Sequence, residues 1–182
     1  MNFAPTALAD AVLVEMVRHQ DERGYFARTA CIDEFAAAGI ETGFPQSSQS
    51  HNSRAGTVRG MHFQRPPHAE AKLVRCERGA VWDVIIDLRP GSPSYRQWQG
   101  FELSAANGRS LFIPKGFAHG FQTLVDETDM LYMISERFVP GVGEGVPFDD
   151  PAFAIPWPLP VSAINDKDRS WPAFTDEAAI RL

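Results

Sequence analysis

The chain has 182 residues, of which 44% are hydrophobic and 22% are charged, a composition typical of one compact globular domain. Its formal net charge of −6 argues against a general nucleic-acid-binding surface, although a local basic pocket can still bind an anionic ligand. The N-terminal stretch lacks a basic leader and no apolar run is long enough to span a membrane, so we expect a cytoplasmic protein.

Turns that contain proline and glycine divide the chain into short segments, and this pattern predicts an all-β domain. The clearest helix is predicted at Asp33–Gly39, with Asp33 as its N-cap and Gly39 as its end. Strands are predicted downstream at Thr57–Gln64, Ala71–Glu77, Val81–Leu88, Gln97–Leu103, Ser110–Ile113, Gly120–Thr123 and Met130–Phe138. Such strands usually close as a barrel or a double-sheet jelly roll that holds one small ligand. We expect one domain over residues 1–182, with a barrel core at about 45–140.

Side-chain alternation gives a first hint of a site. In the strand Ala71–Glu77 it puts Lys72 on the same face as Val74 and Cys76. A lysine on such an apolar face lies at the strand end, snorkels to solvent or lines a cavity. Cys76 and Cys31, the two cysteines of the chain, are expected to be reduced, packed thiols.

The last part of the chain, residues 141–182, is expected to wrap the barrel. Proline and glycine are too frequent in Pro140–Pro160 for regular structure, so this stretch is predicted to be a long ordered loop. Phe148, Phe153 and Trp157 provide its apolar contacts. The final residues are predicted to form a frayed helix.

Two kinds of chemistry fit the polar residues. Three histidines, His62, His68 and His119, with Glu70 or Glu77 nearby, are candidates for a metal site. The close pair of histidines that metal-binding barrels of this kind usually supply is absent, because the residue two positions after His62 is Gln64. We therefore predict that no metal or cofactor is bound.

The second kind of chemistry is proton transfer. A histidine with a carboxylate partner is a general base, a lysine stabilises a developing oxyanion, and a tyrosine returns a proton from the opposite side. His62, Lys72, Tyr132 and an aspartate would form such a set. For each of these residues alone a structural role is the simpler interpretation, so only the joint pattern supports a site.

Seven segments of the chain together resemble the dTDP-4-dehydrorhamnose 3,5-epimerase family. They occur in the family's order and span nearly the whole chain: DERGYF (21–26), GTVRGMHFQRPP (56–67), AKLVRCERGAVWDVIIDLRPGSPSY (71–95), PKGFAHGFQTL (114–124), LYMISERFVP (131–140), DDPAFAIPWP (149–158) and NDKDRSWPAF (165–174). The resemblance implies a cupin-like jelly roll that forms homodimers. It also implies an enzyme that works without metal on a nucleotide-diphosphate sugar, dTDP-linked in this family.

The resemblance further implies roles for single residues. His62 is the base, paired with Asp168; Tyr132 is the acid on the opposite face; and Lys72 steadies the enolate oxygen. The residues implied to contact the substrate are Arg23, Arg59 and Lys167 for the diphosphate or sugar, Phe26 for the nucleotide, and Gln49, His119 and Phe138. The expected reaction is epimerisation of a 4-keto-6-deoxy sugar at C3, at C5 or at both, because the keto group acidifies the protons at these carbons.

Four positions depart from the family pattern. Arg28 replaces a glutamate, Ser47–Gln49 replaces a glutamine–variable–asparagine run, and Phe138 replaces a tyrosine. Gly143 replaces a glutamate, with Glu144 one residue away. These changes fall on substrate recognition, so the exact sugar, the nucleotide and the inverted centre stay open.

Two alternatives also stay open at this point. One is a metal-dependent cupin dioxygenase or isomerase, which elemental analysis distinguishes. The other is a sugar-nucleotide-binding relative that has lost turnover, which solvent deuterium incorporation distinguishes.

Overall fold

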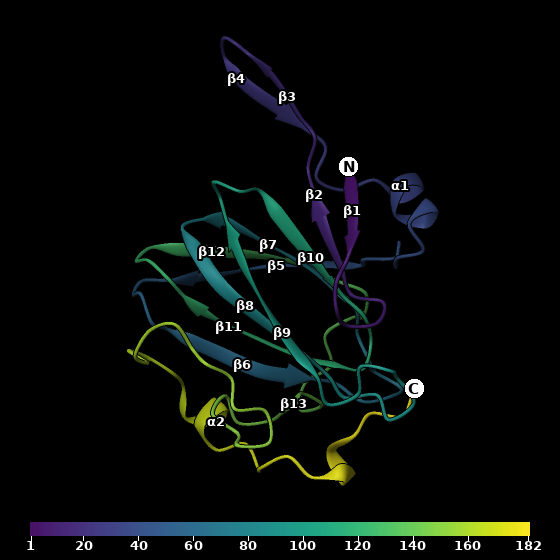
Figure 1. Cartoon of the computed structure of the whole chain (residues 1–182), viewed down its shortest axis with the longest axis vertical. Coiled ribbons are helices and arrows are strands. Elements are labelled where there is room, and N and C mark those ends of the chain that lie inside the picture. The colour runs from purple at the N-terminus through teal and green to yellow at the C-terminus, as the bar shows by residue number, and fades with distance from the viewer.

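The protein, here a computed structural model that describes residues 1–182, consists of two antiparallel sheets packed face to face (Figure 1). In spatial order the first sheet contains β1 (Asn2–Pro5), β2 (Val12–Glu15), β10 (Arg109–Ile113), β7 (Lys72–Arg78), β12 (Thr128–Ile134) and β5 (Gln46–Asn52). The second sheet contains β13 (Glu144–Gly145), β6 (Val58–Phe63), β11 (Phe117–Thr123), β8 (Ala80–Asp87) and β9 (Trp98–Ser104). This architecture confirms the predicted all-β jelly roll.

All seven predicted strands are present, with shifted ends. β11 starts at Phe117 rather than Gly120, and β12 ends at Ile134 rather than Phe138. The strands β1 to β5 and the two-residue strand β13 were missed. The predicted start of the barrel at about residue 45 is wrong, because β1 and β2 pair with each other and β2 pairs with β10.

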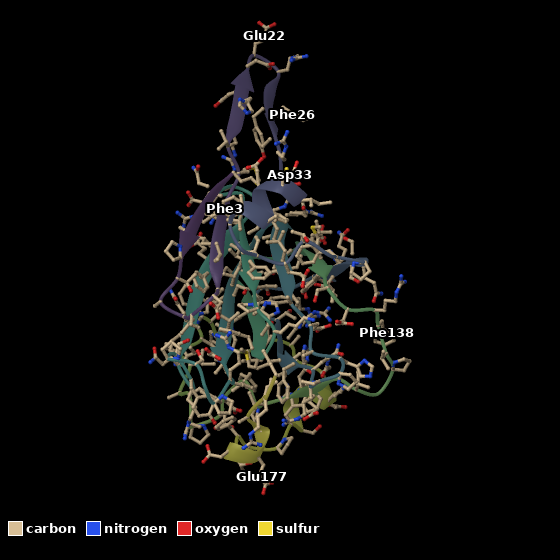
Figure 2. The ribbon with its side chains drawn as sticks, turned by 90° about the vertical axis from the view of Figure 1, so that its right-hand side faces the viewer. Phe3, Glu22, Phe26, Asp33, Phe138 and Glu177 are labelled. Atoms are coloured by element: carbon tan, nitrogen blue, oxygen red, sulfur yellow. The ribbon has the colours of Figure 1, made fainter.

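A two-stranded hairpin, β3 (Arg18–Asp21) and β4 (Gly24–Ala27), extends away from both sheets. In Figure 1 it projects beyond the N-terminus as the outermost part of the molecule, and Figure 2 shows Phe26 on it. Tyr25 and Phe26 are exposed there, Phe26 to 78%. An isolated hairpin with exposed aromatic side chains buries little apolar surface of its own.

The short helix α1 spans Ile32–Ala37. The prediction of Asp33 as N-cap is wrong: Cys31 occupies the cap and makes no capping hydrogen bond, and Asp33 lies in the first turn. The predicted end is confirmed, because Gly39 adopts φ +70° and donates its N–H to the carbonyl of Ala36. Phe35 is the buried residue of this helix.

The main core lies between the two sheets. Its buried apolar residues come from both of them: Leu8, Ala11, Val74, Cys76, Val81, Ile85, Leu103, Leu111, Ile113, Phe117, Phe121 and Met130. Full burial of one such leucine or phenylalanine contributes roughly 1.5–3 kcal/mol. Val74 and Cys76 face this core whereas Leu73 packs outside it with Phe35, so the predicted alternation that places Lys72 on the inner face holds. Both cysteines are free, and burial raises the pKa of the Cys76 thiol to about 11, whereas Cys31 is only half-buried.

The C-terminal segment covers the outer face of the five-stranded sheet (Figure 1). Val146, Phe153 and Ile155 pack there against Val84 and residues on the same face. This segment contains a second helix, α2 (Asp166–Arg169), and the expected helix near the chain end is a single 3-10 turn, η1 (Asp176–Ala178). No helix of the protein has the length and apolar character needed to cross a membrane.

Candidate active site

A cavity of about 560 Å³ opens between the two sheets, within the size range of small-molecule sites. Its lining comes from strands of both sheets and the loops beside them: Gln46, Ser48, Gln49, Ser50, Arg59, His62, Gln64, Glu70, Lys72, His119, Gly120, Phe121, Tyr132, Ile134, Glu136 and Phe138. A second cavity, of about 580 Å³, lies between Arg89 and the C-terminal Leu182. It contains no imidazole and none of the predicted site residues, so we assign the chemistry to the first.

His62 and Asp168 form an imidazole–carboxylate pair at the first cavity. The Nε2 atom of His62, on β6, lies 2.7 Å from Oδ1 of Asp168. Asp168 is brought there by α2, whose N-cap residue Asn165 accepts a hydrogen bond from the Asp168 backbone. The other carboxylate oxygen accepts the N–H of Gly60. The carboxylate is almost completely buried, whereas the His62 side chain is 42% exposed toward the cavity.

The protonation state of this pair follows from its contacts. Burial on its own would raise the pKa of Asp168, but the hydrogen bonds from His62 and Gly60 together hold this pKa below its usual value. Asp168 is therefore an ionised acceptor, and His62 Nε2 must donate its proton to it. This leaves Nδ1 of His62 as the unprotonated nitrogen of the neutral ring.

Lys72 enters the same cavity from β7. Its ammonium lies 3.0 Å from Oε1 of Glu70, and only 12% of its side chain is exposed. Oε2 of Glu70 in turn accepts a hydrogen bond of 2.9 Å from the amide of Gln64. The lysine is therefore a buried cation with one carboxylate partner.

Tyr132, on β12, faces the cavity from the six-stranded sheet. Its hydroxyl lies 3.1 Å from Oγ of Ser50 on the neighbouring strand β5. Burial raises the pKa of Tyr132 above its ordinary value, so this phenol stays protonated at neutral pH. It is thus a protonated hydroxyl on the six-stranded sheet, whereas His62 is on the five-stranded sheet.

A second imidazole–carboxylate pair lies beside the first. His119 on β11 is the direct cross-strand neighbour of His62, and its Nε2 lies 2.9 Å from Oδ2 of Asp83 on β8. Both side chains of this pair are buried, and Oδ1 of Asp83 has no hydrogen-bond partner. The ring of His119 lies 6.4 Å from that of Tyr132.

The protein matches one family over almost its whole length. The family model described as dTDP-4-dehydrorhamnose 3,5-epimerase matches residues 5–176. The enzyme of that name from Methanothermobacter thermautotrophicus is 43% identical over 172 residues, which cover 93% of this chain and 92% of the relative. The crystal structure of the Bacillus anthracis enzyme with TDP and PPi bound superposes with a TM-score of 0.92 at 41% identity, over 95% of this chain and 99% of that one. The chain belongs to the dTDP-4-dehydrorhamnose 3,5-epimerase family.

Membership in this epimerase family confirms the predicted isomerase activity and disfavours both alternatives. The family's relatives differ in the reaction they are named for. The Streptomyces niveus protein named dTDP-4-dehydrorhamnose 3-epimerase is 35% identical over 170 residues, covering 93% of this chain and 82% of the relative. The family therefore includes proteins named for inversion at one centre and proteins named for inversion at two.

The structure gathers most of the residues that the epimerase resemblance pointed to. Besides His62, Lys72 and Tyr132, the cavity is lined by Gln49, Arg59, His119 and Phe138, whereas Asp168 is buried outside the lining and contacts His62. Arg59 is held by the side chain of Asn52 at 2.7 Å. Lys167 lies outside the lining, with its ammonium 5.0 Å from the ring of Trp171.

Two predicted substrate contacts lie far from the cavity. Arg23 and Phe26 are on the β3–β4 hairpin, where Arg23 pairs with Asp21 and is almost fully exposed. Figure 2 shows Phe26 on this hairpin and Phe138 on a loop at the side of the barrel. Within one chain, Arg23 and Phe26 do not line the site that contains His62.

The residues that depart from the family pattern lie partly inside and partly outside the cavity. Arg28 pairs with Glu34 of α1 at 2.7 Å, outside the cavity. Glu144 pairs with Arg65, so it does not stand in for the glutamate replaced at Gly143. Phe138 and Gln49 do line the cavity.

Sequence reasoning missed several polar residues of the site, among them Glu70, Ser50 and Glu136. Glu70 was considered only as a metal ligand, and Ser50 and Glu136 were not considered. A signal for Glu70 was available, because it stands two residues before Lys72 and therefore points to the same face. No three His, Cys, Asp or Glu side chains come together as a possible metal-binding group.

Proposed function

We propose that this epimerase inverts a dTDP-linked 4-keto-6-deoxy sugar at C3, at C5 or at both by proton transfer between two walls of the cavity. The observation that carries the proposal is that His62, Lys72 and Tyr132 line one cavity and that the buried Asp168 forms a hydrogen bond with His62. The two sheets divide these roles, with the base on β6 and the lysine and tyrosine on β7 and β12.

The first step is removal of a proton beside the keto group. Nδ1 of His62 takes the C–H proton, the electron pair moves into the C–C bond, and the C4 carbonyl becomes an enolate. Asp168 stabilises the imidazolium that results, because its carboxylate already accepts the Nε2 proton. Since the two groups are pre-paired, no reorientation of the base is needed.

The second step is return of a proton from the other side. The Lys72 ammonium offsets the charge on the enolate oxygen, an interaction that strengthens as the charge develops. The Tyr132 hydroxyl then protonates the carbon on the face opposite His62. The carbon is inverted, and proton exchange with solvent resets both residues.

Binding of the nucleotide end is proposed to require a second copy of the chain. Arg23 and Phe26 lie on a hairpin that projects away from their own cavity. We propose a homodimer in which each hairpin reaches the cavity of its partner. Arg59, Gln49, Phe138 and His119 then contact the substrate from within the chain, with Lys167 at the rim.

A mixing experiment tests the shared site. Each of two inactive proteins, His62→Ala and Arg23→Ala with Phe26→Ala, is assayed alone and after the two are mixed and allowed to exchange subunits. The shared site predicts restored turnover in the mixture, because a cavity with an intact His62 then receives an intact hairpin. A mixture as inactive as its components, with subunit exchange shown by mass spectrometry, would contradict it.

Two simpler expectations accompany the proposal. Metal analysis of the purified enzyme is expected to find no stoichiometric zinc, iron or nickel, and one equivalent bound through His62 and His119 would contradict the mechanism. The cytoplasmic location stays a prediction, which cell fractionation tests.

A further inference from the structure

We propose that Glu70 is a positioning residue that fixes the Lys72 ammonium at the enolate oxygen. The inference rests on the proposed function, because it gives Lys72 the oxyanion role. Glu70 and Lys72 are both nearly buried, and both line the cavity. Lys72 forms no ion pair other than the one with Glu70.

The need for such a residue follows from the lysine side chain. The backbone of Lys72 is fixed, because its neighbours across the sheet are Ile113 on β10 and Ile134 on β12. Its four-carbon stem still has several rotamers, and ordering a lysine costs up to about 2 kcal/mol of conformational free energy. An ion pair at 3.0 Å inside the cavity selects among these rotamers before substrate arrives.

Glu70 itself is anchored on two sides. Next to it, Ala71 donates its N–H to the Ser135 hydroxyl at 2.8 Å and accepts the Ser135 N–H. The second carboxylate oxygen of Glu70 is held by the Gln64 amide at 2.9 Å. Gln64 follows β6 two residues after His62, so the chain Gln64–Glu70–Lys72 links the strand of the base to the strand of the lysine.

The geometry further indicates that Glu70 acts through position more than through its charge. The buried Oε1 atom of Gln64 has no hydrogen-bond partner. If Glu70 is replaced by glutamine, rotation of the Gln64 amide turns this Oε1 toward the new NH₂ group. The new side chain keeps its own oxygen on Lys72, so both contacts survive without the negative charge. Alanine removes both.

The test compares kcat and KM for Glu70→Ala, Glu70→Gln, Lys72→Ala and the double variant Glu70→Ala/Lys72→Ala on dTDP-4-keto-6-deoxyglucose. Glu70→Ala is expected to lower kcat by about 10- to 100-fold while KM changes less than about threefold, because the lost contact matters in the transition state. Glu70→Gln is expected to stay within about fivefold of the unmodified enzyme. The double variant is expected to be no slower than Lys72→Ala, since the two residues act as a unit.

The matched control is Glu77→Ala. Glu77 pairs with Arg75 on the outer face of the same strand, outside the cavity, so its removal is expected to leave kcat unchanged. If Glu70→Ala does not fold, Gln64→Met replaces it and is compared with Lys72→Ala and with the double variant Gln64→Met/Lys72→Ala. Gln64→Met is expected to lower kcat by about threefold to tenfold, and this loss is expected to disappear when Lys72 is already alanine.

The outcomes distinguish a failure of the proposed role of Lys72 from a failure of the positioning role of Glu70. Unchanged turnover in Lys72→Ala would contradict the proposed role of the lysine. A slow Lys72→Ala beside a fast Glu70→Ala would overturn the positioning role alone. So would a Glu70→Ala loss of equal size with and without Lys72, or a Glu70→Gln variant as slow as Glu70→Ala.

Discussion

The two imidazole–carboxylate pairs of the cavity are nearly identical in geometry and differ in exposure. His62–Asp168 and His119–Asp83 have Nε2–carboxylate distances of 2.7 and 2.9 Å, and the two histidines are direct neighbours across β6 and β11. The side chain of His62 is 42% exposed and that of His119 is 5% exposed. A carboxylate partner alone therefore does not identify the base.

The two histidines differ in exposure because their carboxylate partners come from different parts of the chain. Asp83 is on β8, directly beside β11, so its pair with His119 lies inside the barrel wall. Asp168 comes from α2 in the C-terminal segment and reaches His62 from behind β6. Asp168 therefore orients the His62 imidazole through Nε2 and leaves Nδ1 of His62 available to the substrate. The His119 side chain, in contrast, is buried. We therefore propose that His62 transfers the proton and that His119 contacts the substrate.

Replacement of the two histidines tests this division and has the largest expected effect. His62→Ala is expected to lower kcat by about 10²–10⁴-fold, the usual loss for a general base. His119→Ala is expected to lose about tenfold, the value of one hydrogen bond to substrate. Steady-state kinetics measures both, with circular dichroism as the control for folding. A larger loss for His119→Ala would reverse the assignment.

The two aspartates give the next largest effect. In Asp168→Asn the amide NH₂ donates to Nε2 of His62, which puts the ring proton on Nδ1 and removes the free base. We expect kcat to fall by about 10²–10³-fold, less than in His62→Ala because a minority of rings keep the productive tautomer. Asp83→Asn is expected to lower kcat by less than about tenfold. Equal losses in the two variants would show that exposure does not separate the pairs.

Residues that are not proposed to transfer protons are expected to change selectivity and leave proton removal intact. Phe138→Tyr and Arg28→Glu restore family residues, and a gained or lost polar contact is worth roughly 1–3 kcal/mol, or about ten- to hundredfold in preference. We expect the unmodified enzyme to invert mainly one centre or to prefer another keto-sugar nucleotide, and these variants to shift that preference. NMR of products from dTDP-4-keto-6-deoxyglucose measures it. Efficient inversion at both centres, unaltered by either substitution, would show that the two positions do not set specificity.

The smallest expected effect concerns stability in acid. The pKa of Asp168 is lowered in the folded protein, so its stabilising contribution is fully present above its unfolded value of about 3.9 and is lost as pH falls through the folded pKa. Near neutral pH, Asp168→Asn is expected to cost about 1–3 kcal/mol, the value of a hydrogen bond to a charged group. Urea unfolding at several pH values should show this gap shrinking below about pH 4. A gap that stays constant would mean that the carboxylate charge does not stabilise the fold.

Sequence patterns predicted the longer strands that bury an apolar face and missed polar strands such as β5 and the four-residue strand β2, although Val14 of β2 is buried. β8 alternates Val84 and Ile86 outward with Val81 and Ile85 inward, which is the period-two signal of a packed strand. β5 reads QSSQSHN and lies at a sheet edge, so it carries no apolar pattern although it contributes four residues to the cavity. The extent of residues 1–182 as one domain stays a prediction, which coincident unfolding transitions by two probes would test.

Residues of the site could be predicted where strand alternation or a family motif indicated them. Alternation alone placed Lys72 on the same face as Val74 and Cys76, and lining a cavity was one of three positions that this left open. The contact between His62 and Asp168 joins residues 106 positions apart, and no local pattern encodes such a distance, so only the family resemblance suggested it. Neither source showed that His119 has a carboxylate of its own, because that depends on the pairing of β8 with β11.

The most direct test of the central claim is deuterium incorporation in heavy water, followed by NMR at C3 and C5 of dTDP-4-keto-6-deoxyglucose. Proton transfer between His62 and Tyr132 predicts incorporation with inversion for the unmodified enzyme. It predicts incorporation without inversion for Tyr132→Phe, which keeps the base but lacks the opposite acid, and neither for His62→Asn. Inversion at an undiminished rate in either variant would contradict proton transfer between His62 and Tyr132.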